Sequence, residues 1–369
     1  MKIGIPKEIK VKEYRVGATP AMVHTLVGYG HQVLVETHAG AMIHFSDDDY
    51  RAAGATIVAG PEKVYEADMI VKVKEPQQSE FSLLREGQIL FCFLHLAPDP
   101  IQTKQLIEKK VVGIACDTVT DAMGRLPLLT PMSEIAGRLS IQVGGTALQL
   151  DKGGKGILLG GVPGVAPAKV VVIGGGASGT EAARMAMGAG AQVIIFDKNL
   201  ARLRELDHLY GPMLQTLYST PSAIGEAVAE ADLVIGAVLI PGKIAPKVVT
   251  REMVARMQPG SVIVDISIDQ GGCVETALPT THDDPTFVVN GVIHYCVTNM
   301  PGVCARTATL AFTQATMDYV VAIANKGYVA ALRDDPFLRK GLNVCAGHVT
   351  NANVAHDLNY PYVPAESLL

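Results

Sequence analysis

The stretch from residue 170 to residue 186 constrains the fold more than any other part of the sequence. The apolar, β-branched run 170–173 is followed at once by the six residues GGGASG at 174–179, and then by residues 180–186, which are good helix formers. A strand that passes through glycines directly into a helix is typical of a parallel α/β unit. We therefore predict an α/β fold.

The glycines of this loop have separate tasks in a dinucleotide site. Gly174 permits a tight turn, Gly176 lets the backbone approach a pyrophosphate, and Gly179 permits close packing of the helix, whose N-terminal N–H groups favour anions. Asp197 ends the next predicted strand, about 20 residues further on, where an acid can accept hydrogen bonds from ribose hydroxyls. Because this carboxylate would repel a 2′-phosphate, we predict NAD rather than NADP. The alternative is a turn without a ligand.

The chain alternates short apolar strands with helices in two series, of which the first extends to about residue 130. Its predicted helices start at Thr19-Pro20 and Ser46 and cover 79–85 and 100–109. Its predicted strands are 3–5, 32–36, 56–58, 69–73, 88–94 and 111–115. No glycine-rich phosphate loop occurs in this series, so we assign it to the substrate.

A helical pattern from 133 to about 150 connects this series to the second one. Strands of the second series are predicted at 169–173, 192–196, 233–237, 261–266 and 287–289, and a long helix from about 307 returns the chain to the first domain. We predict two Rossmann-like domains, each a doubly wound parallel sheet, with an active-site cleft between them. The substrate domain comprises 1–130 and 306–369, and the NAD-binding domain comprises 131–305.

The composition argues against several other classes of protein. Lys and Arg total 31 against 36 Asp and Glu, a net charge of -5, so there is no general basic field for nucleic acid or anionic lipid. Apolar runs are interrupted well short of the ~18 residues of a membrane span, and charges near the N-terminus do not fit a signal peptide. The cysteines have no metal-ligand spacing, so we expect no metal site and buried free thiols in a cytoplasmic protein; they are Cys92, Cys116, Cys273, Cys296, Cys304 and Cys345.

Three basic residues are predicted at strand ends of the first domain, where open α/β sheets bind their ligands. Lys74 follows the strand 69–73, His95 follows 88–94, and Arg15 lies in the loop after the first strand. A guanidinium and an ammonium suit a small carboxylate, and a histidine suits proton transfer near neutral pH. Each residue taken singly has an ordinary alternative: Arg15 and Lys74 could be solvated surface charges, and His95 could be a loop histidine bonded to the backbone. Their shared location at strand ends favours a site.

Asp269 follows the predicted strand 261–266, at the edge that also carries the dinucleotide loop. One interpretation places its carboxylate opposite the nicotinamide. The other is that an Asp close to two glycines simply forms a turn. The spacing leaves both open.

Several motifs, spread over essentially the whole length, make the chain resemble the alanine dehydrogenase family. They are Pro6-Lys7-Glu8, 15–20, 71–76, Leu94-His95-Leu96, 131–138, 158–164, 268–273, 280–283 and 298–302. The resemblance implies oxidative deamination of L-alanine to pyruvate and ammonium with NAD, and the reverse reaction, in a homohexamer of two-domain subunits.

The resemblance also implies roles for individual residues. Arg15 and Lys74 would hold the substrate carboxylate, and His95 and Asp269 would be the catalytic pair. The NAD site would be lined by Ser133, Gly174, Gly176, Ala177, Gly179, Asp197, Arg202, Ser219, Val238, Leu239, Ile266, Ser267, Ile268, Asp269, Val297, Thr298, Asn299 and Met300.

The chain departs from the family pattern in two places. Ala277-Leu278 stands where the family usually has Ser-Arg, and 303–306 lacks the usual proline. Two other functions remain open: the NAD-binding component of a proton-translocating transhydrogenase, which would need a membrane partner, and an NAD-binding module without turnover. The motifs at 268–273 and 280–283, with Lys74 and His95, favour the amino-acid enzyme.

Overall fold

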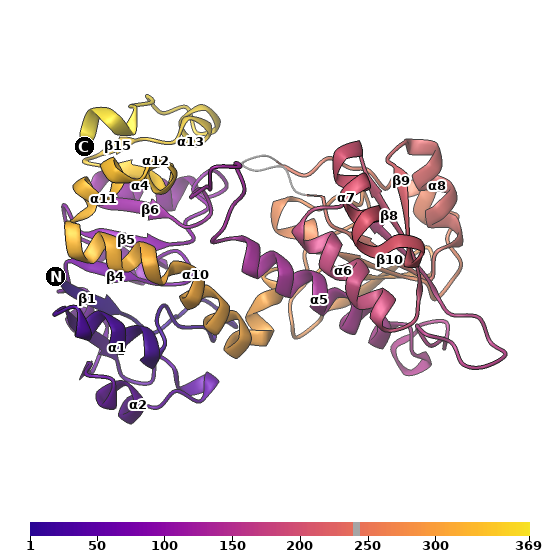
Figure 1. Ribbon diagram of the computed structural model, residues 1–369, viewed down its shortest axis with the longest axis horizontal. Coiled ribbons are helices and arrows are strands. Elements are labelled where there is room, and N and C mark those ends of the chain that lie inside the picture. Colours follow the sequence, from indigo (N-terminus) through magenta and orange to yellow (C-terminus); the bar gives the residue numbers. More distant parts are fainter. Residues whose placement is uncertain (239–243) are drawn as a thin grey trace. The chain divides into compact units, whose positions relative to one another are not determined.

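The computed structural model describes residues 1–238 and 244–369 (Figure 1). Its contacts divide the chain into two compact units. Unit 1 comprises 1–132 and 302–369, and unit 2 comprises 133–301. Unit 1 is therefore built from two separate segments of the chain.

Unit 1 contains an eight-stranded sheet in the order β15-β14-β6-β5-β4-β1-β2-β3. The six strands from the N-terminal segment are all parallel, as the α/β pattern predicts. The strands β14 and β15 were not predicted, and they add an antiparallel edge, so the sheet is mixed. The bounds are β1 Lys2–Ile5, β2 Gln32–Glu36, β3 Thr56–Val58, β4 Met69–Val71, β5 Ile89–Cys92, β6 Val112–Ala115, β14 Leu342–Cys345 and β15 His348–Val349.

The order of these strands places the switch point of unit 1 between β1 and β4. The chain proceeds from β1 to β3 in one direction and then from β4 to β6 in the other. In open α/β sheets, ligands bind at the carboxyl ends of the strands where the order reverses. The segments that follow β1 and β4 therefore start at the expected position of a ligand site.

Local sequence accounts for most of the helix starts in unit 1. The Thr19 hydroxyl accepts a hydrogen bond from Met22 N–H, and Ser46 and Asp49 form a capping box. The predicted helix 79–85 is instead a short 3₁₀ segment, Gln78–Leu83 (η2). The α-helices are α1 Pro20–Gly28, α2 Asp47–Ala52, α3 Pro61–Val64, α4 Pro100–Glu108, α10 Ala305–Lys326, α11 Tyr328–Asp334, α12 Pro336–Arg339 and α13 Ala352–Asp357.

Unit 2 contains a seven-stranded sheet in the order β12-β13-β11-β10-β7-β8-β9, with its switch point between β7 and β10. The strands are parallel except β12, which pairs antiparallel with β13; β9 and β13 were not predicted. The strands are β7 Lys169–Ile173, β8 Gln192–Asp197, β9 Leu214–Tyr218, β10 Leu233–Gly236, β11 Val262–Asp265, β12 Thr286–Val289 and β13 Val292–Tyr295. The helices are α5 Thr130–Ala147, α6 Ala177–Gly188, α7 Leu200–Tyr210, α8 Pro221–Glu230 and α9 Arg251–Ala255.

Each sheet has its own apolar core. Val171, Phe196 and Ile263 are buried together in unit 2, and Ile70 and Leu90 are buried in unit 1. All six cysteines are free thiols; five are buried as predicted, whereas Cys304 is only half-buried. Among the residues that the structure describes, no helix is long and apolar enough to cross a membrane.

Candidate active site

Arg15 lies in the segment after β1 and is buried, with 2% of its surface exposed. Its guanidinium donates to both carboxylate oxygens of Glu13, at 2.7 and 2.6 Å, and the third nitrogen lies 3.2 Å from the Met132 sulfur. Such a two-pronged pair fixes the plane of the guanidinium. Arg15 is therefore not a solvated surface charge, and its partner Glu13 was not foreseen.

Lys74 follows β4 and is held through its backbone. The Glu8 carboxylate accepts hydrogen bonds from the backbone N–H groups of Val73, at 2.7 Å, and of Lys74, at 3.2 Å. Glu8 belongs to the segment after β1, so this one side chain ties together the chain segments that leave the two strands of the switch point.

Glu8 is in turn part of a buried ionic cluster that the sequence analysis missed. The Lys72 ammonium, with no exposed surface, lies 2.6 Å from Glu80 and 3.5 Å from Glu8, and Glu80 also accepts a 2.8 Å bond from the Tyr65 hydroxyl. Burial alone would lower the pKa of Lys72, but the attraction of Glu8 and Glu80 outweighs it and raises that pKa. The cluster keeps Lys72 charged beneath the Lys74 segment.

His95 comes three residues after the end of β5 in an unusual backbone conformation. Its φ of +45° lies in the left-handed region, which few residues other than glycine adopt. Its ring is parallel to that of Phe93, with 5.9 Å between ring centroids, and its Nδ1 lies 3.4 Å from a carboxylate oxygen of Asp117. Asp117 follows β6, so the rule that strand ends carry functional groups could have singled it out.

The dinucleotide loop of unit 2 has the geometry that its glycines predict. Gly174 has a φ of +107°, and a Cβ there would lie 2.4 Å from the Ala237 carbonyl oxygen; a Cβ on Gly179 would lie 1.8 Å from the Gly174 oxygen. A Cβ on Gly176 would meet no protein atom within 4 Å. The space beside Gly176, at the N-terminus of α6, is the space a pyrophosphate would use.

Asp197 ends β8 and contacts the loop itself. One carboxylate oxygen accepts from the Gly175 N–H at 2.7 Å, and the other accepts from the Asn199 N–H at 2.7 Å. Arg202 donates to the Gly175 carbonyl and to the Thr180 hydroxyl, both at 2.7 Å. Asp197 and Arg202 therefore both bind the backbone of the loop at Gly175.

Asp269 lies in the 3₁₀ segment Ile266–Gln270 (η5), directly after β11. Its carboxylate accepts from the Asn299 backbone N–H, at 3.0 and 3.3 Å, and so joins the two stretches 266–269 and 297–300. The side chain thus links two loops in addition to its place in a 3₁₀ turn, and both interpretations given above stay open.

A buried carboxylate anchors the segment that carries Asp269. Asp265 accepts backbone hydrogen bonds from Ser267, Cys273 and Val274, at 2.9 to 3.0 Å. Burial raises its pKa, although these hydrogen bonds act in the opposite direction. Asp265 was not foreseen, although it ends a strand that the sequence predicts.

Most of the other residues expected at NAD lie near the carboxyl ends of strands or in the two joined stretches. Ser219 follows β9 and Val238 follows β10, Ser133 is in α5, and Leu239 lies outside the described residues. Ile268, Val297 and Met300 are buried as whole residues, so in this structure they offer a ligand little surface from either backbone or side chain.

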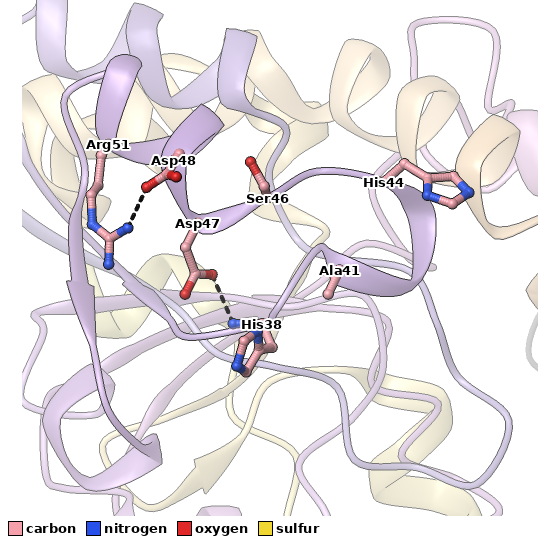
Figure 2. Close-up of a pocket in the computed structure, with 7 residues that line it drawn as sticks. All are labelled: His38, Ala41, His44, Ser46, Asp47, Asp48 and Arg51. Carbon is pink, nitrogen blue, oxygen red and sulfur yellow. Dashed lines mark hydrogen bonds and ion pairs between the residues drawn. The ribbon is translucent and has the colours of Figure 1, made fainter.

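An open pocket of about 540 Å³ lies elsewhere in unit 1 (Figure 2). It is lined by His38, Ala41, His44, Ser46, Asp47, Asp48 and Arg51, none of which the sequence analysis selected. The Asp47 carboxylate accepts from the His38 N–H at 2.8 Å, and Asp48 pairs with Arg51. Within 1–238 and 244–369, no group of three or more His, Cys, Asp or Glu is arranged to hold a metal ion.

The fold and these residues define a two-unit α/β protein with polar groups at the switch point of each sheet. The model of "Alanine dehydrogenase/PNT, N-terminal domain" matches residues 4–136, and that of "Alanine dehydrogenase/PNT, C-terminal domain" matches 140–352. The chain belongs to the alanine dehydrogenase/PNT family.

Individual relatives match over the full length. The chain is 55% identical to the alanine dehydrogenase of Bacillus subtilis (strain 168), covering 100% of this chain and 98% of that one, and 55% identical to that of Methanococcus maripaludis, with both chains covered in full. A solved structure of L-alanine dehydrogenase has a TM-score of 0.94 at 52% identity, over 97% of this chain and 99% of that one. A transhydrogenase from Sinorhizobium meliloti has a TM-score of 0.81 over 95% of this chain and 99% of that one, at 24% identity, which shows a shared fold alone.

Proposed function

We propose that the protein catalyses the NAD-dependent oxidative deamination of L-alanine to pyruvate and ammonium, and the reverse reductive amination. The observation that carries this proposal is the full-length identity of 55% with alanine dehydrogenases. The positions of Arg15, Lys74 and His95 after β1, β4 and β5 support it.

The substrate carboxylate is proposed to bind Arg15 and Lys74. A guanidinium presents a planar fork and an ammonium presents a compact charge, and together they suit the carboxylate that alanine and pyruvate share. Glu13 already orients the guanidinium, and Glu8 holds the Lys74 backbone. These contacts fix the Arg15 guanidinium and the Lys74 main chain before a substrate binds.

The proton transfers are assigned to His95 and Asp269. NAD, when bound, supplies the hydride acceptor for the hydrogen on the alanine α-carbon. His95 removes a proton from the substrate amine and releases it to solvent, and Asp269 orients the attacking water and favours the cationic iminium. The proton that the water loses moves to the carbinolamine nitrogen, and His95 then takes the hydroxyl proton as the C–N bond breaks and ammonia leaves. In the reverse direction the same groups return protons while ammonia replaces water.

The residues present fit a dinucleotide. The open space beside Gly176 and the N-terminus of α6 suit the pyrophosphate, and Asp197 suits the ribose hydroxyls. We propose NAD rather than NADP because the same carboxylate repels a 2′-phosphate. The remaining residues at the cofactor are those given above, with roles implied by the family.

The family resemblance also supports proposals about the surroundings of the enzyme. We propose a homohexamer whose partners are L-alanine, pyruvate and ammonium, in the cytoplasm, with no nucleic acid or membrane partner. Unit 1 would be the substrate domain and unit 2 the NAD-binding domain.

One experiment separates this function from its two rivals. The pure protein is incubated with NAD and a panel of L-amino acids while reduced nicotinamide is monitored. Reduction that depends on alanine supports the proposal. NAD binding without amino-acid-dependent reduction favours a binding module, and hydride exchange between nucleotides that needs a membrane partner favours a transhydrogenase component.

A further inference from the structure

Asp117 contacts both the backbone beside His95 and the His95 ring. The strands β5 and β6 are parallel neighbours in which Cys92 is opposite Ala115, so the residues that follow each strand leave the sheet side by side. One Asp117 oxygen accepts from the Leu94 N–H at 3.0 Å, and the other lies 3.4 Å from His95 Nδ1. In the part of the chain that the structure describes, Asp117 is the one carboxylate within 4.0 Å of that ring.

The Asp117 side chain is more buried than the His95 side chain, as expected when a carboxylate orients a histidine that a substrate must reach. Asp117 is mostly covered, with 14% of its side chain exposed, whereas the His95 side chain is 42% exposed. Because Nδ1 faces Asp117, the second ring nitrogen, Nε2, points away from the carboxylate. The left-handed backbone at His95 and the parallel Phe93 ring restrict the imidazole to this orientation.

We propose that Asp117 is a positioning residue that keeps the proton of neutral His95 on Nδ1, so that Nε2 is the base. This inference deepens the function proposed above and rests on it for the role of His95. A carboxylate only accepts hydrogen bonds, so an Nδ1 that faces it carries the proton, which leaves the lone pair on Nε2. A hydrogen bond to one ring nitrogen also fixes the orientation of the ring.

The proton balance follows from this arrangement. When Nε2 takes a proton from the substrate amine or the carbinolamine hydroxyl, the N–H or O–H bond of the substrate breaks and an Nε2–H bond forms. The ring then carries a positive charge beside the negative Asp117, which stabilises it. The distance of 3.4 Å is long for a hydrogen bond, as is common for catalytic pairs without substrate.

The test is the variant Asp117→Asn, which has almost the same shape. Its side-chain oxygen can still accept from the Leu94 N–H, but its amide group donates toward Nδ1 and so favours the proton on Nε2. We expect the kcat for alanine oxidation to fall by about 10²- to 10⁴-fold, the usual contribution of a general base. The KM for alanine and the Kd for NAD should stay within about threefold of wild type, and Asp117→Glu should recover at least about tenfold in kcat over Asp117→Asn, since it restores the carboxylate.

The matched control is Asp99→Asn. Asp99 precedes α4 and accepts from the Gln102 N–H, and asparagine caps helices as well as aspartate does. This control removes the same charge four residues after His95, and its kcat should equal that of wild type.

A second readout does not depend on turnover. The nitrogen chemical shifts of the His95 ring, assigned by their absence in His95→Gln, show which nitrogen is protonated in the neutral ring. A proton on Nδ1 in wild type and on Nε2 in Asp117→Asn supports the inference.

Several results would overturn the inference. One is a wild-type proton on Nε2; another is a kcat for Asp117→Asn within about threefold of wild type. A third is an Asp117→Asn variant in which kcat and the melting temperature fall and KM rises together, with no recovery in Asp117→Glu. That result would indicate a purely structural role. If wild type shows no alanine-dependent reduction of NAD, the proposed function fails, and the ring shifts still decide the role of Asp117.

Discussion

Asp197 accepts a 2.7 Å hydrogen bond from the backbone N–H of Gly175. The acid at the end of β8 is thereby fixed against the loop at the end of β7, and these two strands are neighbours in the sheet. A single carboxylate therefore shapes the glycine-rich loop and, in the NAD site proposed above, would also set the charge beside the ribose.

The choice between NAD and NADP should depend on this carboxylate. We expect Asp197→Ser to weaken NAD binding by about tenfold or more, the value of a charge-assisted hydrogen bond. The use of NADP relative to NAD should rise, because the repulsion of a 2′-phosphate is removed. The kcat/KM values for both cofactors measure this. The control is Asp207→Ser on the exposed side of α7, and an unchanged ratio in Asp197→Ser would remove Asp197 from the ribose site.

Binding of the substrate carboxylate should require both basic residues. Arg15→Met and Lys74→Met should each lose about 1.5 to 3 kcal/mol, or roughly 10- to 150-fold in kcat/KM for pyruvate, while NAD binding survives. Arg15→Met also removes the guanidinium that pairs with the buried Glu13, so the melting temperature of this variant must be followed. Lys104→Met, on the exposed face of α4, is the control. Turnover of pyruvate that is insensitive to both changes would place the substrate pocket elsewhere.

The proposed catalytic pair should behave as one unit in a double-mutant cycle. His95→Ala and Asp269→Ala should each lower kcat by about 10²- to 10⁴-fold, and the double variant should lose little more, since members of one catalytic unit are strongly non-additive. Each variant should still bind NAD. Asp269→Ala should bind NAD more weakly than the others, because it removes the carboxylate that accepts from the Asn299 N–H. Strictly multiplicative losses would mean that the two residues act independently, and near-normal turnover in Asp269→Ala would remove it from the mechanism.

The buried ionic cluster should matter for stability. Lys72→Met leaves Glu8 and Glu80 without their cation, and breaking a buried pair in this way costs about 3 to 5 kcal/mol. The exposed pair of Lys63 with Glu66 provides the control, since solvent screens such a pair and Lys63→Met should change the stability little. Denaturant unfolding of the three proteins measures the difference, and equal stabilities of the two variants would contradict the prediction.

The same cluster predicts a pH dependence with a definite sign. The pKa of Lys72 is raised in the folded protein above its ordinary value of 10.5, so the folded state holds this proton more tightly than the unfolded state does. Its contribution to stability is fully present below pH 10.5 and is lost as the pH rises through the folded pKa. Above neutral pH, the stability difference between wild type and Lys72→Met should therefore shrink only when the solution becomes strongly alkaline; a difference that already disappears near pH 8 would contradict this.

The sequence determined the features whose causes lie close together in the chain. The strand, the glycines and the helix at 170–186 are contiguous. Gly174 is required by a turn with positive φ, and Gly179 by its close approach to the Gly174 carbonyl oxygen within the loop. Most of the parallel strands were predictable for the same reason, because apolar runs and capped helices are local patterns; β9 and β13 were missed. The short edge strands β14 and β15 carry too little of such a pattern to be recognised.

The tertiary structure alone decided which side chains meet. Asp117 reaches His95, and Glu8 reaches Lys72, because neighbouring strands of the sheet bring their ends together. Glu80 reaches Lys72 from η2, within the connection from β4 to β5. No spacing in the sequence encodes these pairs, since the lengths of the intervening helices and loops are free to vary while the strand order stays fixed. The sequence by itself therefore specified the residue types at the strand ends, and the order of the strands in each sheet decided which of them became partners.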